Sequence, residues 1–304
     1  MEDANPIVKW EDLDSDILVR ILLSFNILER TSTGIPHVCR AWRVAACDPA
    51  IWKTLDLTGL KLNFIKTPTE PYVYVQVQSD KTVTRVLKVA LSLSHGNTTA
   101  LLFHPQLYLS DEQLTYAAER CPKLKRLVLP SYNRIRKTGL CKAIGQWPEL
   151  ESLTMPSIAS PAYLMEEIAV NCPNFSELKV MGPFDIRCAS ALVEYLPNLK
   201  VLSLRCSIIF KNALLAILEG LQQLEILNIS HSIILEDSAK CTRENAVGIE
   251  ESTLEMAARL PKFIRCKEPN CLMCERTTAD EGLVRWYKYE EGLWKADEVP
   301  SLAL

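Results

Sequence analysis

Hydrophobic residues recur along most of the chain at a nearly constant spacing. In residues 221–229 the apolar positions follow the pattern L-x-x-L-x-x-L-x-I, and residues 196–204 repeat it with leucine throughout. Sparser copies lie upstream, and the last apolar residue of each copy stands at position 103, 129, 155, 180, 204 or 229. The last two apolar positions of each copy alternate with a period of two, which predicts a short strand rather than a helix.

A strand that recurs about every 25 residues with the pattern L-x-x-L-x-L is typical of leucine-rich repeats. We therefore predict an α/β fold, a leucine-rich-repeat solenoid whose right-handed βα units build a parallel concave sheet. The repeats are expected over residues 53–265, followed by a C-terminal cap or tail over 266–304. An apolar L-D-L triplet at 55–57 predicts the first strand, but the next copy comes about two periods later, so we expect an insertion at 60–82.

Residues 10–52 do not follow the repeat and predict three short helices. The first spans about 14–25 and is apolar around most of its circumference, the second begins near Leu28, and the third begins at Pro36. A unit this small cannot cover so much apolar surface by itself. Either the adjoining repeats or a partner protein must therefore cover the rest.

The same N-terminal residues resemble the F-box motif. The matching letters are W-E-D-L at 10–13, D-I-L at 16–18, V-C-R-A-W-R at 38–43 and I-W at 51–52. Position 14 is Asp where the family usually has Pro. With the repeats behind an F-box at residues 6–52, the whole chain resembles the plant F-box/leucine-rich-repeat proteins, a small all-α module followed by a solenoid.

The resemblance implies a substrate receptor of an SCF-type ubiquitin ligase. The F-box would dock on a Skp-family adaptor, which links it to a cullin scaffold, and the repeats would bind an unknown protein for ubiquitination. By motif position, the candidates for the adaptor contact or its immediate support are Leu13, Ile17, Ile21, Val38, Cys39 and Trp42. The alternative for each of these residues is a place in the core of the small module.

Strand alternation also predicts which repeat residues face outward on the concave sheet. Reading the same position across repeats gives ladders of outward-facing side chains, which we expect to bind the substrate because concave solenoid faces are common binding surfaces. The predicted substrate-binding residues are Arg126, Val128, Thr154, Glu177, Lys179, Ser203, Arg205 and Asn228. The alternative is a face that is simply solvated. A small-molecule co-receptor role is not favoured, because the ladders contain no cluster of Lys and Arg.

Composition excludes several classes of partner. The net charge of −3 gives no basic footprint for nucleic acid. The chain contains no apolar run of the length that spans a membrane, and its first residues do not resemble a signal peptide. The 11 cysteines are interpreted as reduced thiols, so we expect the cytoplasm and/or the nucleus.

The spacing Cys266-x4-Cys271-x2-Cys274 is the one metal-like pattern. A structural zinc site needs four ligands, and the fourth would have to be Cys241 or another distant group. The C-x-x-C pair could also have a redox role, but it lacks the strand–helix setting of such motifs. We therefore expect free thiols and predict no metal ligands and no cofactor.

No catalytic motif accompanies the repeats, since the sequence has no nucleophile elbow and no glycine-rich phosphate loop. We therefore predict no catalytic residues and a non-catalytic subunit of a ligase complex. Two alternatives remain open. One is an F-box scaffold without a degradative role, and the other is a repeat scaffold without any tie to a ligase.

Overall fold

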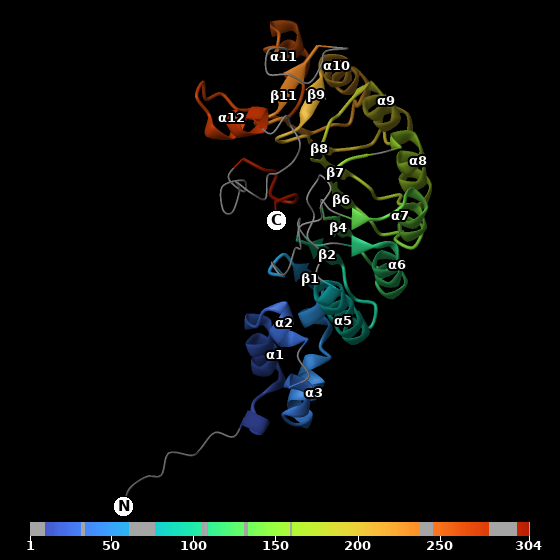
Figure 1. Ribbon diagram of the computed structural model, residues 1–304, viewed down its shortest axis with the longest axis vertical. Helices are drawn as coiled ribbons and strands as arrows, with labels where there is room; N and C mark the ends of the chain where they lie inside the picture. The colour runs from blue at the N-terminus through green and yellow to red at the C-terminus, as the bar shows by residue number, and fades with distance from the viewer. Residues whose placement is uncertain are drawn as a thin grey trace, which may run out of the picture.

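Eight parallel strands form one curved sheet along the length of the molecule (Figure 1). The computed structural model describes residues 10–31, 34–60, 77–104, 107, 109–130, 133–158, 160–236, 246–279 and 297–303. The sheet contains, in spatial order, β1 (Thr54–Leu57), β2 (Ala100–Phe103), β4 (Arg126–Val128), β6 (Ser152–Met155), β7 (Glu177–Val180), β8 (Val201–Ser203), β10 (Ile226–Asn228) and β12 (Lys262–Ile264). Since every neighbour in this order is the next repeat, the predicted α/β leucine-rich-repeat solenoid is confirmed.

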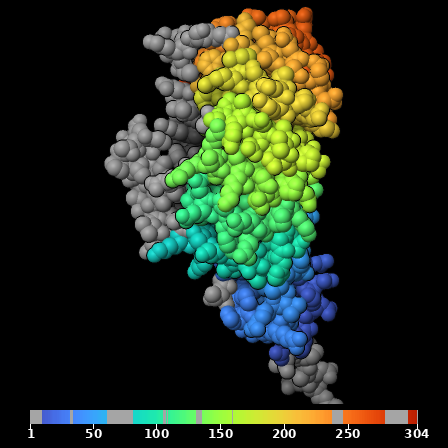
Figure 2. Space-filling view, turned by 90° about the vertical axis from the view of Figure 1, so that its right-hand side faces the viewer, coloured from blue at the N-terminus to red at the C-terminus, as the bar shows by residue number. Residues whose placement is uncertain are grey.

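Helices follow the strands and line the convex side of the sheet (Figure 1). They are α5 (Val77–Ser94), α6 (Asp111–Arg120), α7 (Lys137–Ile144), α8 (Pro161–Asn171), α9 (Ile186–Tyr195), α10 (Lys211–Gly220) and, at the end, α11 (Glu251–Ala257). Two smaller parallel pairs join β3 (Leu109–Ser110) to β5 (Asn133–Arg134) and β9 (Ile208–Phe210) to β11 (Ile233–Leu235). The space-filling view shows the repeats stacked in chain order, with the N-terminal residues at one end (Figure 2).

The strand register confirms the ladders predicted from the repeat period. Ala100, Arg126 and Ser152 are direct partners across β2, β4 and β6, and the ladder that contains Thr154 and Lys179 is equally continuous. The leucine between the two outward positions of each strand is fully buried, from Leu101 to Leu227. Each such side chain contributes about 1.5–3 kcal/mol through burial.

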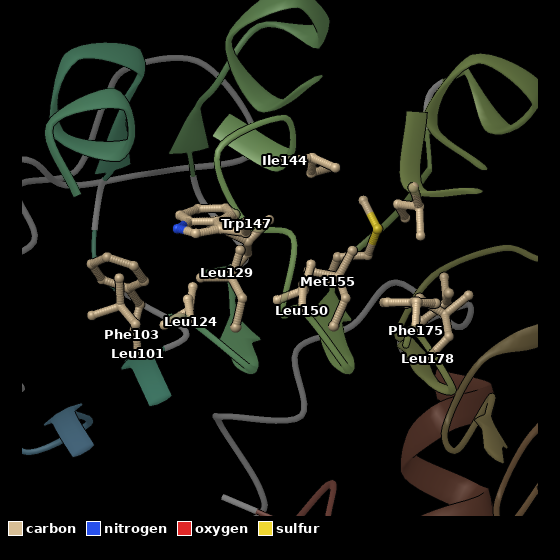
Figure 3. Packing of buried hydrophobic residues seen from close by; sticks show 14 of the residues in the cluster. Leu101, Phe103, Leu124, Leu129, Ile144, Trp147, Leu150, Met155, Phe175 and Leu178 are labelled. Carbon is tan, nitrogen blue, oxygen red and sulfur yellow. The ribbon is translucent and has the colours of Figure 1, made fainter. Parts of the chain in front are cut away.

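Figure 3 shows the consequence for the core: one stack of apolar side chains passes from repeat to repeat between sheet and helices. Trp147 and Leu129 fill the space between neighbouring repeats there. Because each repeat buries its apolar face on the next, no repeat is stable without its neighbours.

The predicted insertion at 60–82 ends in a helix. Its last residues belong to α5, which begins at Val77 and buries Val83, Val86 and Leu87 in the core. The sequence Tyr72-Val73-Tyr74-Val75-Gln76-Val77 within this insertion alternates as a strand does, and its first five residues lie outside the described residues, whereas Val77 belongs to the helix α5. At the other end, β12 pairs in parallel with β10, so the repeats continue to the end of the range predicted for them.

The N-terminal module consists of short helices that precede β1. They are η1 (Trp10–Asp12), α1 (Ser15–Ser24), α2 (Ile27–Arg30), η2 (Ile35–His37), α3 (Arg40–Ala46) and α4 (Pro49–Trp52). Within the module, the Trp52 indole donates a buried hydrogen bond to the carbonyl of Ala46 at 2.7 Å. A second buried hydrogen bond joins the module to the solenoid, from the Thr98 hydroxyl to the carbonyl of Trp52 at 3.0 Å.

The prediction of one continuous third helix from Pro36 is wrong. The chain makes a 3-10 turn, closed by the hydrogen bond from the Val38 amide to the Ile35 carbonyl, and Cys39 is then extended at φ −161° and ψ 179°. The α-helix begins only at Arg40. This break changes the direction of the chain between Val38 and Trp42, and it leaves Val38 outside the helix.

Candidate functional site

Apolar side chains are exposed mainly on the N-terminal module. Among the described residues nine large hydrophobic side chains are exposed, and five of them lie within residues 10–44. These five, which we call the docking patch, are Trp10, Ile17, Leu23, Val38 and Val44. The other four are distributed along the rest of the chain, from Tyr163 to Leu272. This concentration of exposed apolar side chains makes the N-terminal module the candidate protein-binding surface.

The structure divides the six predicted adaptor residues into three groups. Ile17 and Val38 are 44% and 58% exposed, so both side chains are available to a partner. Leu13, Ile21 and Cys39 are half-buried against the core. None of these placements tests the contact itself, which stays a prediction.

Trp42, the sixth predicted adaptor residue, is only 9% exposed and packs edge-on against Trp10, with ring centroids 6.5 Å apart. It therefore positions the surface rather than forming it. Trp10, Leu23 and Val44 were not among the predicted adaptor residues, although the apolar circumference of the first helix was a signal for Leu23.

The second candidate site, the concave sheet, holds a residue from the end of the chain. The Glu298 carboxylate accepts hydrogen bonds from Ser203 Oγ at 2.9 Å and Asn228 Nδ2 at 2.9 Å, and Lys179 Nζ lies 2.9 Å from its other oxygen. Lys179, Ser203 and Asn228 occupy the same ladder position on three adjacent strands, β7, β8 and β10. One carboxylate is thus bound by three consecutive repeats.

This carboxylate is ionised in the folded chain. Burial alone would raise the pKa of Glu298, but the charge of Lys179 and hydrogen bonds from Lys179, Asn228 and the Val299 amide outweigh it and lower the pKa. A buried charge persists only where it is paired and hydrogen-bonded in this way. The concave face therefore contains a specific carboxylate-binding site.

The residues around Glu298 attach to the sheet as well. Arg205 Nε donates to Asp297 Oδ1 at 2.9 Å, and Arg126 Nη2 donates to the carbonyl of Ala303 at 2.7 Å. Val299 and Leu302 are buried against Val201, in a small cluster of their own. Residues 297–303, which we call the tail segment, therefore lie across the concave face, where Figure 1 places the C-terminus.

The tail segment bears directly on the predicted substrate-binding residues. Arg126, Lys179, Ser203, Arg205 and Asn228 all contact it. Val128 and Thr154 are buried, whereas Glu177, like Arg126, is half-buried. Their role in binding a substrate stays a prediction. Sequence reasoning missed the tail segment because it does not follow the repeat.

Cysteines fall into two classes. Burial raises the pKa of the Cys121 and Cys172 thiols to about 12, so these core residues remain protonated and unreactive. Cys266, Cys271 and Cys274, in contrast, converge with His231, and their ligand atoms lie within 4.8 Å of one another. This is the one such convergence of metal-ligating side chains in the part of the chain that the structure describes.

The spacing of the three cysteines was recognisable in the sequence, but the histidine that completes the group was not. His231 lies 35 residues before Cys266, in the turn after β10, and the repeat pattern gave no reason to select it. Cys241, the fourth ligand considered from the sequence, lies outside the described residues.

Within the described helices, none has the length and apolar character needed to span a membrane.

Comparison with known proteins gives close relatives. The chain is 56% identical over 305 residues to an F-box/LRR-repeat protein of Arabidopsis thaliana, an alignment that covers 99% of this chain and 98% of that protein. It is 27% identical over 173 residues to the F-box protein SKIP1 of the same plant, covering 56% and 54% of the two chains. No protein-family model matches the chain. Among solved structures, internalin C2 of Listeria monocytogenes aligns with a TM-score of 0.35 and 16% identity over 59% of this chain and 75% of that one, a likeness too low to carry an argument.

Proposed function

The chain belongs to the plant F-box/LRR-repeat proteins, and from this premise we propose that it is the substrate-recognition subunit of an SCF-type ubiquitin ligase. The N-terminal module docks on a Skp-family adaptor, and the adaptor connects it to a cullin scaffold. The solenoid holds the protein to be ubiquitinated. The proposed site of action is the cytoplasm, the nucleus or both.

The docking patch is the observation that carries this proposal. Ile17 lies on α1 and Val38 directly follows η2, and both residues are exposed. The module sits at one end of the solenoid, well away from the tail segment (Figure 1). A partner can therefore cover the docking patch while the concave face remains accessible from the other side.

The proposed role is positional rather than catalytic. A receptor that binds both the scaffold and the target raises the effective concentration of target lysines near a ubiquitin-loaded enzyme. No chemical step is assigned to this chain. Its specificity comes from the surface that the repeats present.

For that surface we propose a composite of the sheet and the tail segment. Arg126 and Glu177 are both half-buried and stand two rungs apart in the same ladder, with Ser152 between them. Burial lowers the pKa of Arg126, although the charges of Glu177 and Asp56 oppose this shift. A target that instead reaches Lys179 or Asn228 must displace Glu298, which already satisfies both of them.

Reconstitution tests the proposal. The full chain, a plant Skp-family adaptor and a cullin–RING pair are mixed and separated by size-exclusion chromatography. We expect a single complex that contains all the components and supports transfer of ubiquitin to co-purifying plant proteins. A chain that elutes apart from the adaptor contradicts the proposal and leaves a repeat scaffold without a tie to the ligase.

A further inference from the structure

We propose that His231, Cys266, Cys271 and Cys274 bind a structural zinc ion. The four side chains come from three places in the chain. His231 lies in the turn after β10, Cys266 follows β12, and Cys271 and Cys274 stand at the start of α12 (Leu272–Ala279). The site lies at the end of the solenoid opposite to the docking patch (Figure 1), so it is independent of the proposed adaptor contact.

The separations fit a tetrahedral ion. His231 Nδ1 lies 3.3 Å from the Cys271 sulfur and 3.4 Å from the Cys274 sulfur. With Zn–S of about 2.3 Å and Zn–N of about 2.0 Å, a tetrahedral site places nitrogen and sulfur ligands about 3.5 Å apart and two sulfurs about 3.8 Å apart. The limit of 4.8 Å on all pairs accommodates both distances.

The other nitrogen of the same ring supplies the orientation that metal-bound histidines need. His231 Nε2 lies against Asp297 Oδ2, and Asp297 Oδ1 accepts a hydrogen bond from Arg205 Nε. A carboxylate at Nε2 holds the proton on that nitrogen and leaves the lone pair of Nδ1 directed at the sulfurs. This carboxylate–histidine arrangement is the usual outer support of a zinc ligand.

The backbone around His231 belongs to the repeat. His231 has φ 59°, and Cys206, one repeat earlier, has φ 56°. Histidine tolerates this left-handed conformation better than most residues do. The turn that these two repeats share therefore turns the imidazole toward the C-terminal cysteines.

Hydrophobic burial alone does not account for the order of this segment. Among residues 265–278 only Cys271 and Thr277 are buried, and Leu272 is more than half exposed. Neither cysteine nor threonine burial supplies much apolar area. Short segments with so little core are commonly held by a metal or by disulfides.

The ligand set selects the ion and its role. Three thiolates and one imidazole favour zinc over the hard cations magnesium and calcium. Binding releases three thiol protons, and the Zn²⁺ ion with three thiolates and a neutral histidine carries a net charge of −1. All four positions are filled by protein, so the site is closed and structural. It ties α12 to the last repeats, and through Asp297 it adjoins the tail segment on the concave face.

Metal analysis of the purified full chain tests the site. We expect about one zinc ion per chain by mass spectrometry of the metals, as for any closed structural site. Cys271→Ser and Cys274→Ser should each lose most of the zinc, whereas Cys47→Ser, a half-buried thiol in the N-terminal module, should retain it. Circular dichroism of each variant reports whether the rest of the chain is folded.

Cobalt replacement gives a second reading that needs no variant. Zinc is removed from the reduced native chain by a chelator, and Co²⁺ is added. We expect the strong visible bands of a tetrahedral ion and a thiolate charge-transfer band, both lost when zinc is restored. A native chain with only trace zinc and no such spectrum overturns the proposal, as does undiminished zinc in both cysteine variants. Neither result bears on the ligase role.

Discussion

Lys179 Nζ lies 2.9 Å from Glu298 Oε2, and both side chains are almost completely removed from solvent. The two residues belong to the middle of the solenoid and to the end of the chain. Their pairing closes the concave face over the strands β7, β8 and β10, because the same carboxylate also binds Ser203 and Asn228. The chain thus occupies part of its own candidate binding surface.

Removing the charge of Glu298 should destabilise the fold. Breaking one partner out of a buried, hydrogen-bonded ion pair costs about 3–5 kcal/mol, because the other charge remains buried. Glu298→Gln should therefore lower the free energy of unfolding by roughly that amount in denaturant titrations. Glu151→Gln is the matched control, since Glu151 pairs with Lys125 at 2.7 Å on the exposed surface, and it should change little. Equal effects of the two substitutions would contradict the structural role of Glu298.

The same carboxylate predicts a dependence of stability on pH. The folded-state pKa of Glu298 is lower than its ordinary value of 4.5, so the ionised group stabilises the fold above pH 4.5. This contribution is lost as the pH falls below 4.5 through the folded-state pKa. Thermal unfolding of the native chain should therefore lose stability over this range more steeply than Glu298→Gln does. Parallel curves for the two proteins would show that Glu298 is not the group responsible.

Trp42 should act on stability rather than only on binding. The ring is buried in the N-terminal module and packs against Trp10, so Trp42→Ala should cost about 3–5 kcal/mol. Ile17→Asp changes a side chain that is 44% exposed and should leave the unfolding transition nearly unchanged. Unfolding curves of the two variants are recorded by circular dichroism. They distinguish a residue that supports the fold, Trp42, from a residue that is exposed for contact with the partner, Ile17.

The carboxylate behind His231 should tune the zinc site without abolishing it. Asp297→Asn keeps the size of the side chain but removes the charge that faces His231 Nε2 and Arg205. Loss of such an outer contact typically weakens metal affinity about 10- to 100-fold. Competition with a zinc indicator should show this decrease, and an affinity equal to that of the native chain would argue against Asp297 as the orienting group.

The repeat period predicted more of the structure than any other feature. A spacing of about 25 residues was enough to place Arg126 beside Ser152 and Lys179 beside Ser203, because parallel strands from successive repeats pair in register. The repeat period predicts nothing about residues outside the repeat pattern. Long-range contacts, which local patterns do not encode, bring the tail segment to the concave face and His231 to the three C-terminal cysteines.

The N-terminal module was predicted less completely. Its motif identified the residues near the surface, but the break at Cys39 depends on a local choice between a 3-10 turn and an α-helix, which Pro36 permits equally. Exposure also could not be assigned from the motif, since Val38 and Trp42 lie four residues apart and have opposite environments. Only the packing of η1 against α3 decides which of them faces solvent.

Affinity for the adaptor tests the central claim most directly. The full chain is titrated with a plant Skp-family adaptor, beside the double variant Ile17→Asp/Val38→Asp and the control Val170→Asp, whose side chain is 76% exposed on α8. Removing two central contacts of hot-spot strength should weaken the affinity of the double variant for the adaptor at least about 100-fold. The control should bind as the native chain does, and all three should have the same circular dichroism. A double variant that binds as tightly as the native chain, or a native chain that does not bind, would contradict the docking patch as the adaptor site.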